Sequence, residues 1–196
     1  MLIKNWRKEI FTIPNILSLF RLVLIPVYLL IYLGAEETAD YFLAAAILAV
    51  SCITDLIDGK IARHFNMISN LGKILDPLAD KATQLALIVC LALRYVAVRY
   101  VLVVFVIKES FQLIAGSLKM RKGQMLKGAL FSGKICTTIL FLSLIFMVLL
   151  PSLEESIIQM ISAVDIIFML VAFTDYALTY KRNGAMFQAI NSNNDE

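Results

Sequence analysis

Charged residues are scarce in this chain. They make up 17% of its 196 residues, and hydrophobic residues make up 60%, whereas soluble domains carry about 25% charged residues. A soluble domain of this size could not bury so much apolar surface. The composition therefore excludes a disordered chain and a nucleic-acid-binding domain, and it indicates an integral membrane protein.

Glycine, proline and cysteine are also few, with 8 Gly, 4 Pro and 3 Cys. So few glycines exclude a collagen-like repeat, and the short alternating segments of a membrane β-barrel are missing as well. Cys52, Cys90 and Cys136 are odd in number and fit no metal-binding spacing, so we expect reduced thiols inside helices. The many Leu, Ile, Val and Phe residues favour a helical membrane protein.

Long apolar runs are what the sequence has in abundance. Each is about as long as a helix that crosses roughly 30 Å of hydrocarbon. The six runs are Ile16–Gly34, Asp40–Ala62, Gly72–Leu93, Val98–Leu118, Leu130–Leu150 and Ser156–Leu178. Because the connections are short, we predict one all-α domain, residues 14–180, with six transmembrane helices. The first run is too long for a signal-peptide core and contains Arg21, so we expect it to be retained.

The two ends of the chain differ from this domain. Residues 1–13 hold Trp6 and Phe11 among basic residues, which predicts an interfacial amphipathic helix; a frayed charged terminus is the alternative. Residues 181–196 are polar and predict a mobile tail. Basic residues gather in the connections on the side of the two termini, and acidic residues dominate the other side. The positive-inside rule then predicts that both termini face the cytoplasm, and we expect the protein in the cell (inner) membrane.

Four carboxylates are expected at membrane depth: Asp55, Asp58, Asp76 and Asp80. Only fourteen uncharged residues separate Asp40 from Asp55, roughly 21 Å of helix, so the second span must include its acidic turns to cross. An ionised carboxylate there costs at least about 2.5 kcal/mol. Each pair shares a helix face, at spacings of three and four residues. A short connection joins the two helices as antiparallel neighbours, so all four carboxylates can converge.

Such a cluster suits metal ions. Four hard oxygen donors without His or Cys favour Mg²⁺, Mn²⁺ or Ca²⁺ over zinc, and their number fits two cations about 4 Å apart, as used in displacement at phosphorus. Gly59 and Ala62 leave room for a nucleotide, and Arg63 could pair with a phosphate. The alternative is a salt-bridge network with the neighbouring basic residues. Pro77 would clash with the preceding turn of a regular helix, so we expect the third span to start near Leu75 or to kink at Pro77.

This segment resembles the signature of the CDP-alcohol phosphatidyltransferases, D-x2-D-G-x2-A-R-x8-G-x3-D-x3-D. All eight fixed positions are matched, by Asp55, Asp58, Gly59, Ala62, Arg63, Gly72, Asp76 and Asp80. The resemblance implies a homodimeric membrane enzyme that transfers the phosphatidyl group of CDP-diacylglycerol to an alcohol and releases CMP. It implies that the four Asp hold two divalent cations, Mg²⁺ or Mn²⁺, and that Asp80 is the general base. Residues implied at the CDP site are Asn15, Asp55, Gly59, Ala62 and Arg63.

The acceptor alcohol is indicated by other segments. Thr12–Arg21 resembles the start of phosphatidylglycerophosphate synthases and of single-motif cardiolipin synthases. Gly133-Lys134 with Thr137-Thr138 resembles a further segment of the glycerophosphate enzymes, and Lys108-Glu109 stands where they carry Arg-Glu. This resemblance implies glycerol 3-phosphate as the acceptor, with Lys108 and Lys134 binding its phosphate and Arg121 and Lys122 assisting. Lys108, eleven residues before Lys119, and Asp80, eight residues after Gly72, lie at comparable depth, roughly 16 Å and 12 Å, so we expect the two lysines to point into the same cavity as Asp80.

Several alternatives remain. Gly116 stands where the glycerophosphate enzymes carry a second Arg, which keeps cardiolipin synthase, with phosphatidylglycerol as acceptor, as the rival function. Lys108 could instead pair with Asp165, and Lys134 could snorkel to the headgroups. Asp175 and Tyr176 could touch the acceptor, but we expect them to pack locally. A cation transporter would also explain buried carboxylates, but it explains neither Gly59 nor Arg63.

Overall fold

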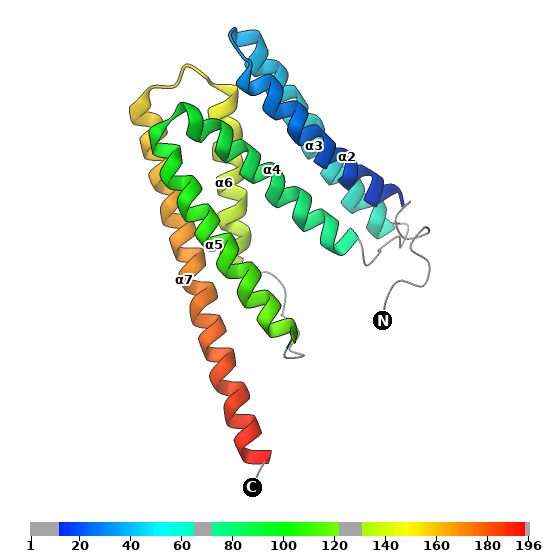
Figure 1. Cartoon of the computed structure of the whole chain (residues 1–196), viewed down its shortest axis with the longest axis vertical. Coiled ribbons are helices and arrows are strands. Elements are labelled where there is room, and N and C mark those ends of the chain that lie inside the picture. The colour runs from blue at the N-terminus through cyan, green and yellow to red at the C-terminus, as the bar shows by residue number, and fades with distance from the viewer. Residues whose placement is uncertain (1–11, 65–71, 122–130, 195–196) are drawn as a thin grey trace. The chain divides into compact units, whose positions relative to one another are not determined.

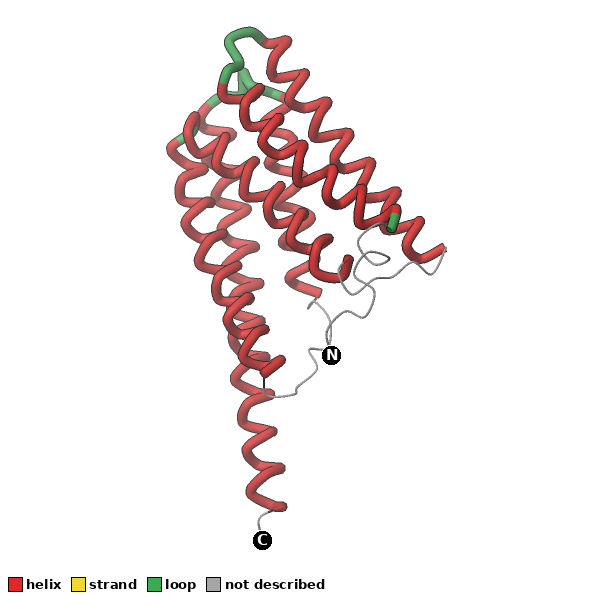
Figure 2. Tube along the Cα trace, turned by 45° about the vertical axis from the view of Figure 1, so that its right-hand side comes forward, coloured by secondary structure: helices red, strands yellow, loops and turns green. Residues whose placement is uncertain are grey.

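The computed structural model describes residues 12–64, 72–121 and 131–194. Within these ranges all regular elements are helices, as Figures 1 and 2 show. They are α2 (Ile13–Leu33), α3 (Thr38–His64), α4 (Gly72–Arg94), α5 (Val96–Arg121), α6 (Phe131–Leu149) and α7 (Glu155–Asn194). The predicted all-α fold is confirmed for this part of the chain, with one helix for each apolar run.

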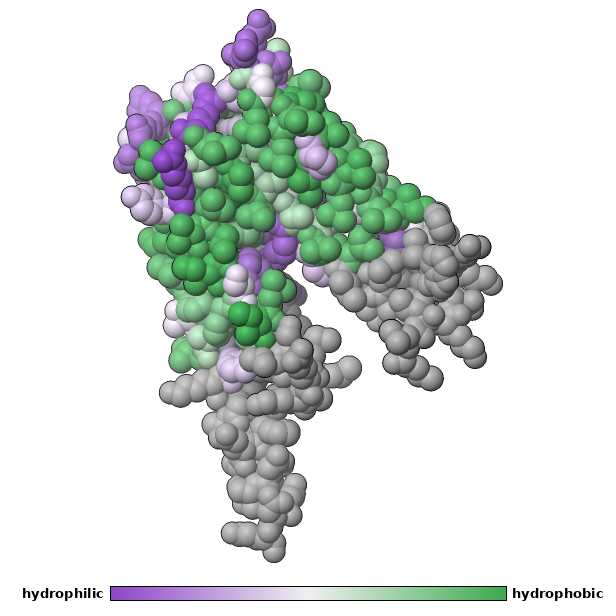
Figure 3. Space-filling view, in the orientation of Figure 1, coloured by the Kyte–Doolittle hydropathy of each residue, from purple (hydrophilic) through white to green (hydrophobic). Residues whose placement is uncertain are grey.

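Membrane-spanning character is strongest in three of the helices. Asn15–Leu33, Phe131–Leu149 and Glu155–Tyr180 are long and apolar enough to cross a membrane, and Thr38–Thr54 is a shorter apolar helix. The other helices carry charge within the apolar run, such as Asp80 in α4 and Lys108 in α5. Large apolar side chains cover the outer sides of the helices, seen as green surface in Figure 3. These features fit a membrane protein; the number of six spans stays a prediction.

The chain divides into two compact units. The first comprises residues 1–94 and 144–152, and the second comprises residues 95–143 and 153–196. In the first unit, α2 packs against both α3 and α4. The sequence predicts α3 and α4 as direct neighbours, whereas among the described residues α2 is the helix that contacts both.

Three tyrosine rings form a cluster in the first unit. The rings of Tyr28 and Tyr32 lie 5.7 Å apart, and Tyr41 meets Tyr32 edge-on at 5.4 Å. The Arg94 guanidinium lies 4.7 Å from the centre of the Tyr41 ring. Its Nη2 also donates a hydrogen bond of 3.0 Å to the Pro151 carbonyl. These contacts tie the end of α4 to α3 and to the connection that follows α6.

In the second unit, α7 is the central contact helix. The rings of Phe111 on α5 and Phe173 on α7 lie 4.9 Å apart, and α5 packs along α7. Two serine–aspartate hydrogen bonds join α6 to α7, from Ser132 to Asp175 and from Ser143 to Asp165. Interhelical hydrogen bonds of this kind hold helices together where no water competes for the polar groups.

Two expectations about helix ends can be compared with the structure, and a third cannot. The start near Leu75 is wrong, because α4 begins at Gly72 and contains Pro77. Proline has no N–H, so the carbonyl of Lys73 lacks its usual intrahelical donor. The helix α7 continues through Asn194, into the expected tail at 181–196; the mobility of that segment stays a prediction. The expected interfacial helix at 1–13 falls almost entirely outside the described residues.

Candidate active site

One face of α4 carries two of the predicted carboxylates. Asp76 and Asp80 lie four residues apart on α4 and therefore share a face. On α2, the buried polar residues Asn15, Ser18 and Arg21 recur every three residues, at 1%, 0% and 2% exposure. The polar stripe of α2 faces the acidic face of α4.

Two hydrogen bonds join these faces. Ser18 Oγ donates to Asp76 Oδ1 at 2.6 Å, and Arg21 Nη1 donates to Asp80 Oδ1 at 2.8 Å. In the second contact, which is an ion pair, the arginine side chain is 3% exposed and the aspartate side chain 51%. The cation is thus buried in protein while its carboxylate partner reaches the surface of the unit. An arginine inside a membrane helix needs such a partner.

The start of α2 places this stripe. Pro14 lies in the first turn of α2, where its missing N–H leaves no hydrogen bond unmade. Thr12 precedes the helix in an extended conformation, and its carbonyl accepts a hydrogen bond from the Ile16 N–H. The helix is therefore already formed at Asn15, so the three polar side chains share one regular face.

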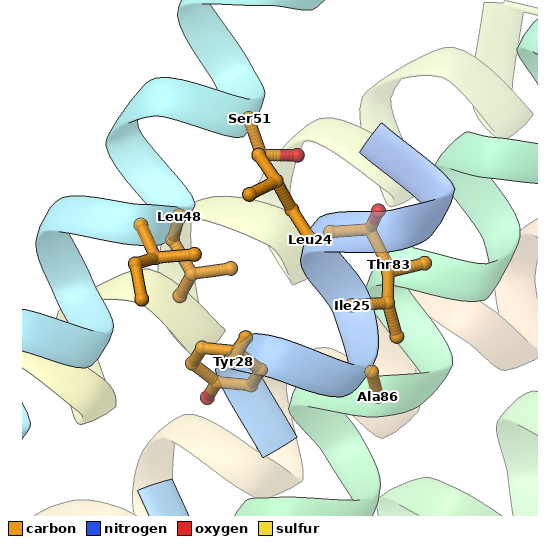
Figure 4. Close-up of a pocket in the computed structure, with 8 residues that line it drawn as sticks. Leu24, Ile25, Tyr28, Leu48, Ser51, Thr83 and Ala86 are labelled. Carbon is orange, nitrogen blue, oxygen red and sulfur yellow. The ribbon is translucent and has the colours of Figure 1, made fainter. Parts of the chain in front are cut away.

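A small pocket lies one helical turn beyond the two hydrogen bonds. Figure 4 shows its lining, which comes from three helices of the first unit: Leu24, Ile25 and Tyr28 of α2, Ile47, Leu48 and Ser51 of α3, and Thr83 and Ala86 of α4. Leu24 follows Arg21 by three residues, and Thr83 follows Asp80 by three. The surroundings of the polar contacts thus become apolar within one turn.

The donors of this site suit a hard divalent cation. Asp76 and Asp80 supply carboxylate oxygens, the ligands that Mg²⁺ and Mn²⁺ prefer, and Ser18 holds Asp76 as hydrogen-bonding partners hold metal-ligating carboxylates. No cluster of three His, Cys, Asp or Glu that could hold a metal occurs in the described part of the chain. The side chains of Asp55 and Asp58, on α3, lie outside it. The convergence of all four stays a prediction.

The expected CDP-binding residues are only partly described. Gly59, Ala62 and Arg63 lie in the last turns of α3, but their side chains are outside the described residues. Asn15 is buried at the start of α2, one turn before Ser18. Its position on the polar stripe agrees with a place beside the carboxylates of α4. Contact of these residues with CDP stays a prediction.

Lys108 has a different partner from the alternative that the sequence offered. It is 2% exposed, and its Nζ donates to Glu109 Oε1 at 2.7 Å. Asp165 instead accepts a 2.6 Å hydrogen bond from Ser143, and its Oδ1 has no hydrogen-bond partner in the described residues. Pairing between Lys108 and Asp165 is therefore wrong.

The register of the second unit places Lys108 and Lys134 at similar depth. Phe111 is level with Phe173, so Lys108 is level with about residue 170 of α7. Ser132 is level with Asp175, so Lys134 is level with about residue 173. The two lysines are thus separated by roughly 5 Å along α7. Their cavity shared with Asp80 stays a prediction, since Asp80 belongs to the first unit.

The remaining candidate acceptor residues are hardly described. Arg121 is the last residue of α5, and its side chain is outside the described residues, as is Lys122 altogether. Asp175 and Tyr176 do pack locally, against Ser132 and Gly133 on α6. Ser18 and Arg21 are the site residues that sequence reasoning missed. Their signal was the three-residue recurrence of polar side chains in an apolar run, together with an arginine at membrane depth.

Comparison with known proteins finds several relatives with similar sequences. A cardiolipin synthase (CMP-forming) of Streptomyces coelicolor is 36% identical over 132 residues, which are 66% of this chain and 61% of that protein. A probable phosphatidylglycerophosphate synthase of Mycobacterium tuberculosis is 46% identical over 77 residues, 38% of this chain and 37% of that protein. A CDP-diacylglycerol–glycerol-3-phosphate 3-phosphatidyltransferase of Bacillus subtilis is 36% identical over 110 residues, 50% of this chain and 57% of that protein.

The chain therefore spans between about a third and three fifths of the length of these relatives. The family match is broader. The model of the CDP-alcohol phosphatidyltransferase family matches residues 11–177, which include the α2 polar stripe, the eight-position motif and both candidate acceptor lysines. The motif, the all-helical fold and this match agree, and the chain belongs to the CDP-alcohol phosphatidyltransferase family.

Proposed function

We propose that this protein transfers the phosphatidyl group of CDP-diacylglycerol to glycerol 3-phosphate, giving phosphatidylglycerophosphate and CMP in phospholipid biosynthesis. The observation that carries the proposal is the acidic face of α4, which belongs to a complete family motif. Its two carboxylates accept hydrogen bonds from Ser18 and Arg21 of α2. Relatives whose names state this reaction support it.

The reaction is a displacement at phosphorus. The acceptor hydroxyl oxygen bonds to the phosphorus of the phosphatidyl group, the bond from that phosphorus to the CMP oxygen breaks, and CMP leaves with the electron pair. Asp55, Asp58, Asp76 and Asp80 would hold two divalent cations, Mg²⁺ or Mn²⁺, which when bound neutralise the diphosphate.

The chain's own residues orient the reactants. Asp80 takes the proton of the acceptor hydroxyl, a general-base role worth about 10²–10⁴-fold in rate. Arg21 holds Oδ1 of this carboxylate and Ser18 holds Oδ1 of Asp76, so neither carboxylate has to be ordered when substrate binds. Preorganised groups of this kind lower the entropic cost of reaching the transition state.

Lys108 and Lys134 are proposed to bind the phosphate of the acceptor. Their similar depth in the second unit supports a shared role, and charge-assisted contacts to phosphate are stronger than neutral ones. Arg121 and Lys122 would assist. We further propose a homodimer in the cell membrane. Both termini and the active site would face the cytoplasm, an orientation that the distribution of basic residues supports.

Cardiolipin synthase is the second candidate. Gly116, in place of a second arginine, favours an acceptor with a singly charged phosphodiester, and relatives in Streptomyces coelicolor and Schizosaccharomyces pombe carry the cardiolipin synthase name. Phosphatidylglycerol would then be the acceptor.

A product assay separates these functions. Purified protein is given labelled CDP-diacylglycerol with Mg²⁺ or Mn²⁺ and, in turn, glycerol 3-phosphate, phosphatidylglycerol, inositol phosphate or serine. Phosphatidylglycerophosphate formed only with glycerol 3-phosphate supports the proposal. Cardiolipin formed only with phosphatidylglycerol replaces it with the second candidate. Without CMP release under any condition, phosphatidyl transfer is ruled out and a cation transporter becomes the working hypothesis.

A further inference from the structure

The first turn of α6 is fastened to α7 at two adjacent residues. Ser132 Oγ donates a hydrogen bond to Asp175 Oδ2, and Gly133 lies directly against the ring of Tyr176. A Cβ at position 133 would stand 2.8 Å from Tyr176 Oη and 2.9 Å from Cε2, closer than side-chain carbons approach such atoms. A methyl group at position 133 would therefore require the Tyr176 ring or α6 to shift.

The same turn is also braced from the inside. Thr137 Oγ1 donates to the Gly133 carbonyl at 3.0 Å, and Thr138 Oγ1 donates to the Lys134 carbonyl at 2.9 Å. These two bonds stiffen the turn within α6, and the contacts of Ser132 and Gly133 with α7 restrict the rotation of this turn about the helix axis. A helix advances by about 100° per residue, so fixing Ser132 and Gly133 also fixes the direction in which residue 134 leaves the helix.

Lys134 is the residue that this arrangement presents. Its side chain is exposed, and no hydrogen bond or ion pair of its Nζ occurs within the described residues. Asp175, the nearby acid of α7, accepts its hydrogen bond from Ser132, and no ion pair with Lys134 is found in that part of the chain. The ammonium group is thus held on an ordered turn, and no carboxylate among the described residues of its unit neutralises it.

We propose that Ser132, Gly133, Asp175 and Tyr176 form a positioning device that aims Lys134 at the phosphate of the acceptor. The inference rests on the proposed function, in which Lys134 binds that phosphate. It assigns Asp175 and Tyr176 a role in acceptor affinity although neither touches the acceptor. When these contacts are lost, the Lys134 side chain adopts more orientations, and the acceptor binds more weakly. The CDP-diacylglycerol site of the first unit is unchanged.

The experiment compares two serines of α6. Ser132→Ala and Ser143→Ala each remove one hydrogen bond from α6 to an aspartate of α7, but Ser143 lies nine residues further along the helix than Lys134, roughly 14 Å away. For Ser132→Ala we expect the acceptor KM to rise about fivefold, or about 1 kcal/mol at 1.4 kcal/mol per decade. The KM for CDP-diacylglycerol stays unchanged in both variants, and Ser143→Ala keeps the wild-type acceptor KM. Ser132→Thr retains the hydroxyl, so we expect its acceptor KM to equal that of the wild-type protein.

Gly133→Ala provides an independent test. The added methyl group must displace Tyr176 or α6, so the acceptor KM rises about tenfold. In a Tyr176→Ala background the same substitution has little further effect, because the atoms that it would meet are gone. Additive effects of the two changes would contradict the close approach as the cause.

The outcomes separate the inference from the proposed function. The acceptor is the one that the wild-type protein uses in the product assay. If that acceptor is phosphatidylglycerol, the proposed function fails, and the two serine variants are compared on the KM for phosphatidylglycerol. Equal acceptor KM values in Ser132→Ala and Ser143→Ala overturn the positioning role with either acceptor. A selective rise in Ser132→Ala supports it with either acceptor.

Discussion

Ser18→Ala should weaken the binding of divalent cations. Ser18 Oγ, fully buried, donates a 2.6 Å hydrogen bond to Asp76 Oδ1, and Asp76 is a proposed metal ligand. Losing a hydrogen bond to a charged group costs about 1.5–3 kcal/mol. Losing the partner that orients a metal ligand typically costs about 10–100-fold in affinity, equivalent to about 1.4–2.8 kcal/mol. The two estimates agree, so we expect a Mn²⁺ dissociation constant raised by about 10–100-fold.

The measurement is a Mn²⁺ titration of the purified protein in detergent, followed by the electron paramagnetic resonance signal of free Mn²⁺. Activity against Mn²⁺ concentration provides a second readout, with the midpoint shifted by the same factor and the rate at saturation little changed. Ser143→Ala is the matched control, because it removes a 2.6 Å hydrogen bond to Asp165 in the other unit. An unchanged midpoint in folded Ser18→Ala, beside lost binding in Asp76→Asn, would refute the orienting role of Ser18.

Four further substitutions test the site. Asp55→Asn or Asp76→Asn should abolish turnover in a protein with wild-type helix content, because each removes a hard anionic ligand; full activity in EDTA would contradict this. Asp80→Asn should still bind CDP-diacylglycerol but lose about 10²–10⁴-fold in rate, and wild-type turnover with metals bound would remove Asp80 as the base. Lys134→Ala should raise the KM for glycerol 3-phosphate by roughly tenfold, because one contact of about 1.5–3 kcal/mol is lost. The KM for CDP-diacylglycerol should stay unchanged, and equal changes in both KM values would argue against a phosphate contact.

The acidic motif could be predicted because its spacing is local. Positions four residues apart on one helix share a face whatever else the chain does, so Asp76 and Asp80 were placed together correctly. Their partners on α2 could not be predicted, because the contact joins residues 58 and 59 positions apart. It depends on the rotation and register of α2 against α4, which side-chain packing determines.

The partner of Lys108 shows the same limit at short range. Adjacent residues on a helix do not face each other, so the sequence offered Asp165 on another helix as the alternative and overlooked Glu109. In the structure the long lysine side chain reaches the carboxylate beside it at 2.7 Å. Helix geometry sets the direction of a Cα–Cβ bond, but a side chain of four methylene groups has enough freedom to depart from it.

The length of α7 has a practical consequence. Its 40 residues make a helix of roughly 60 Å, about twice the thickness of the hydrocarbon core, while its apolar part ends at Tyr180. The backbone of 181–194 continues as helix, so this segment reaches roughly 20 Å beyond the apolar part. An affinity tag or a fluorescent protein fused at this end would stand clear of a detergent micelle. The fusion would be accessible to resin or antibody.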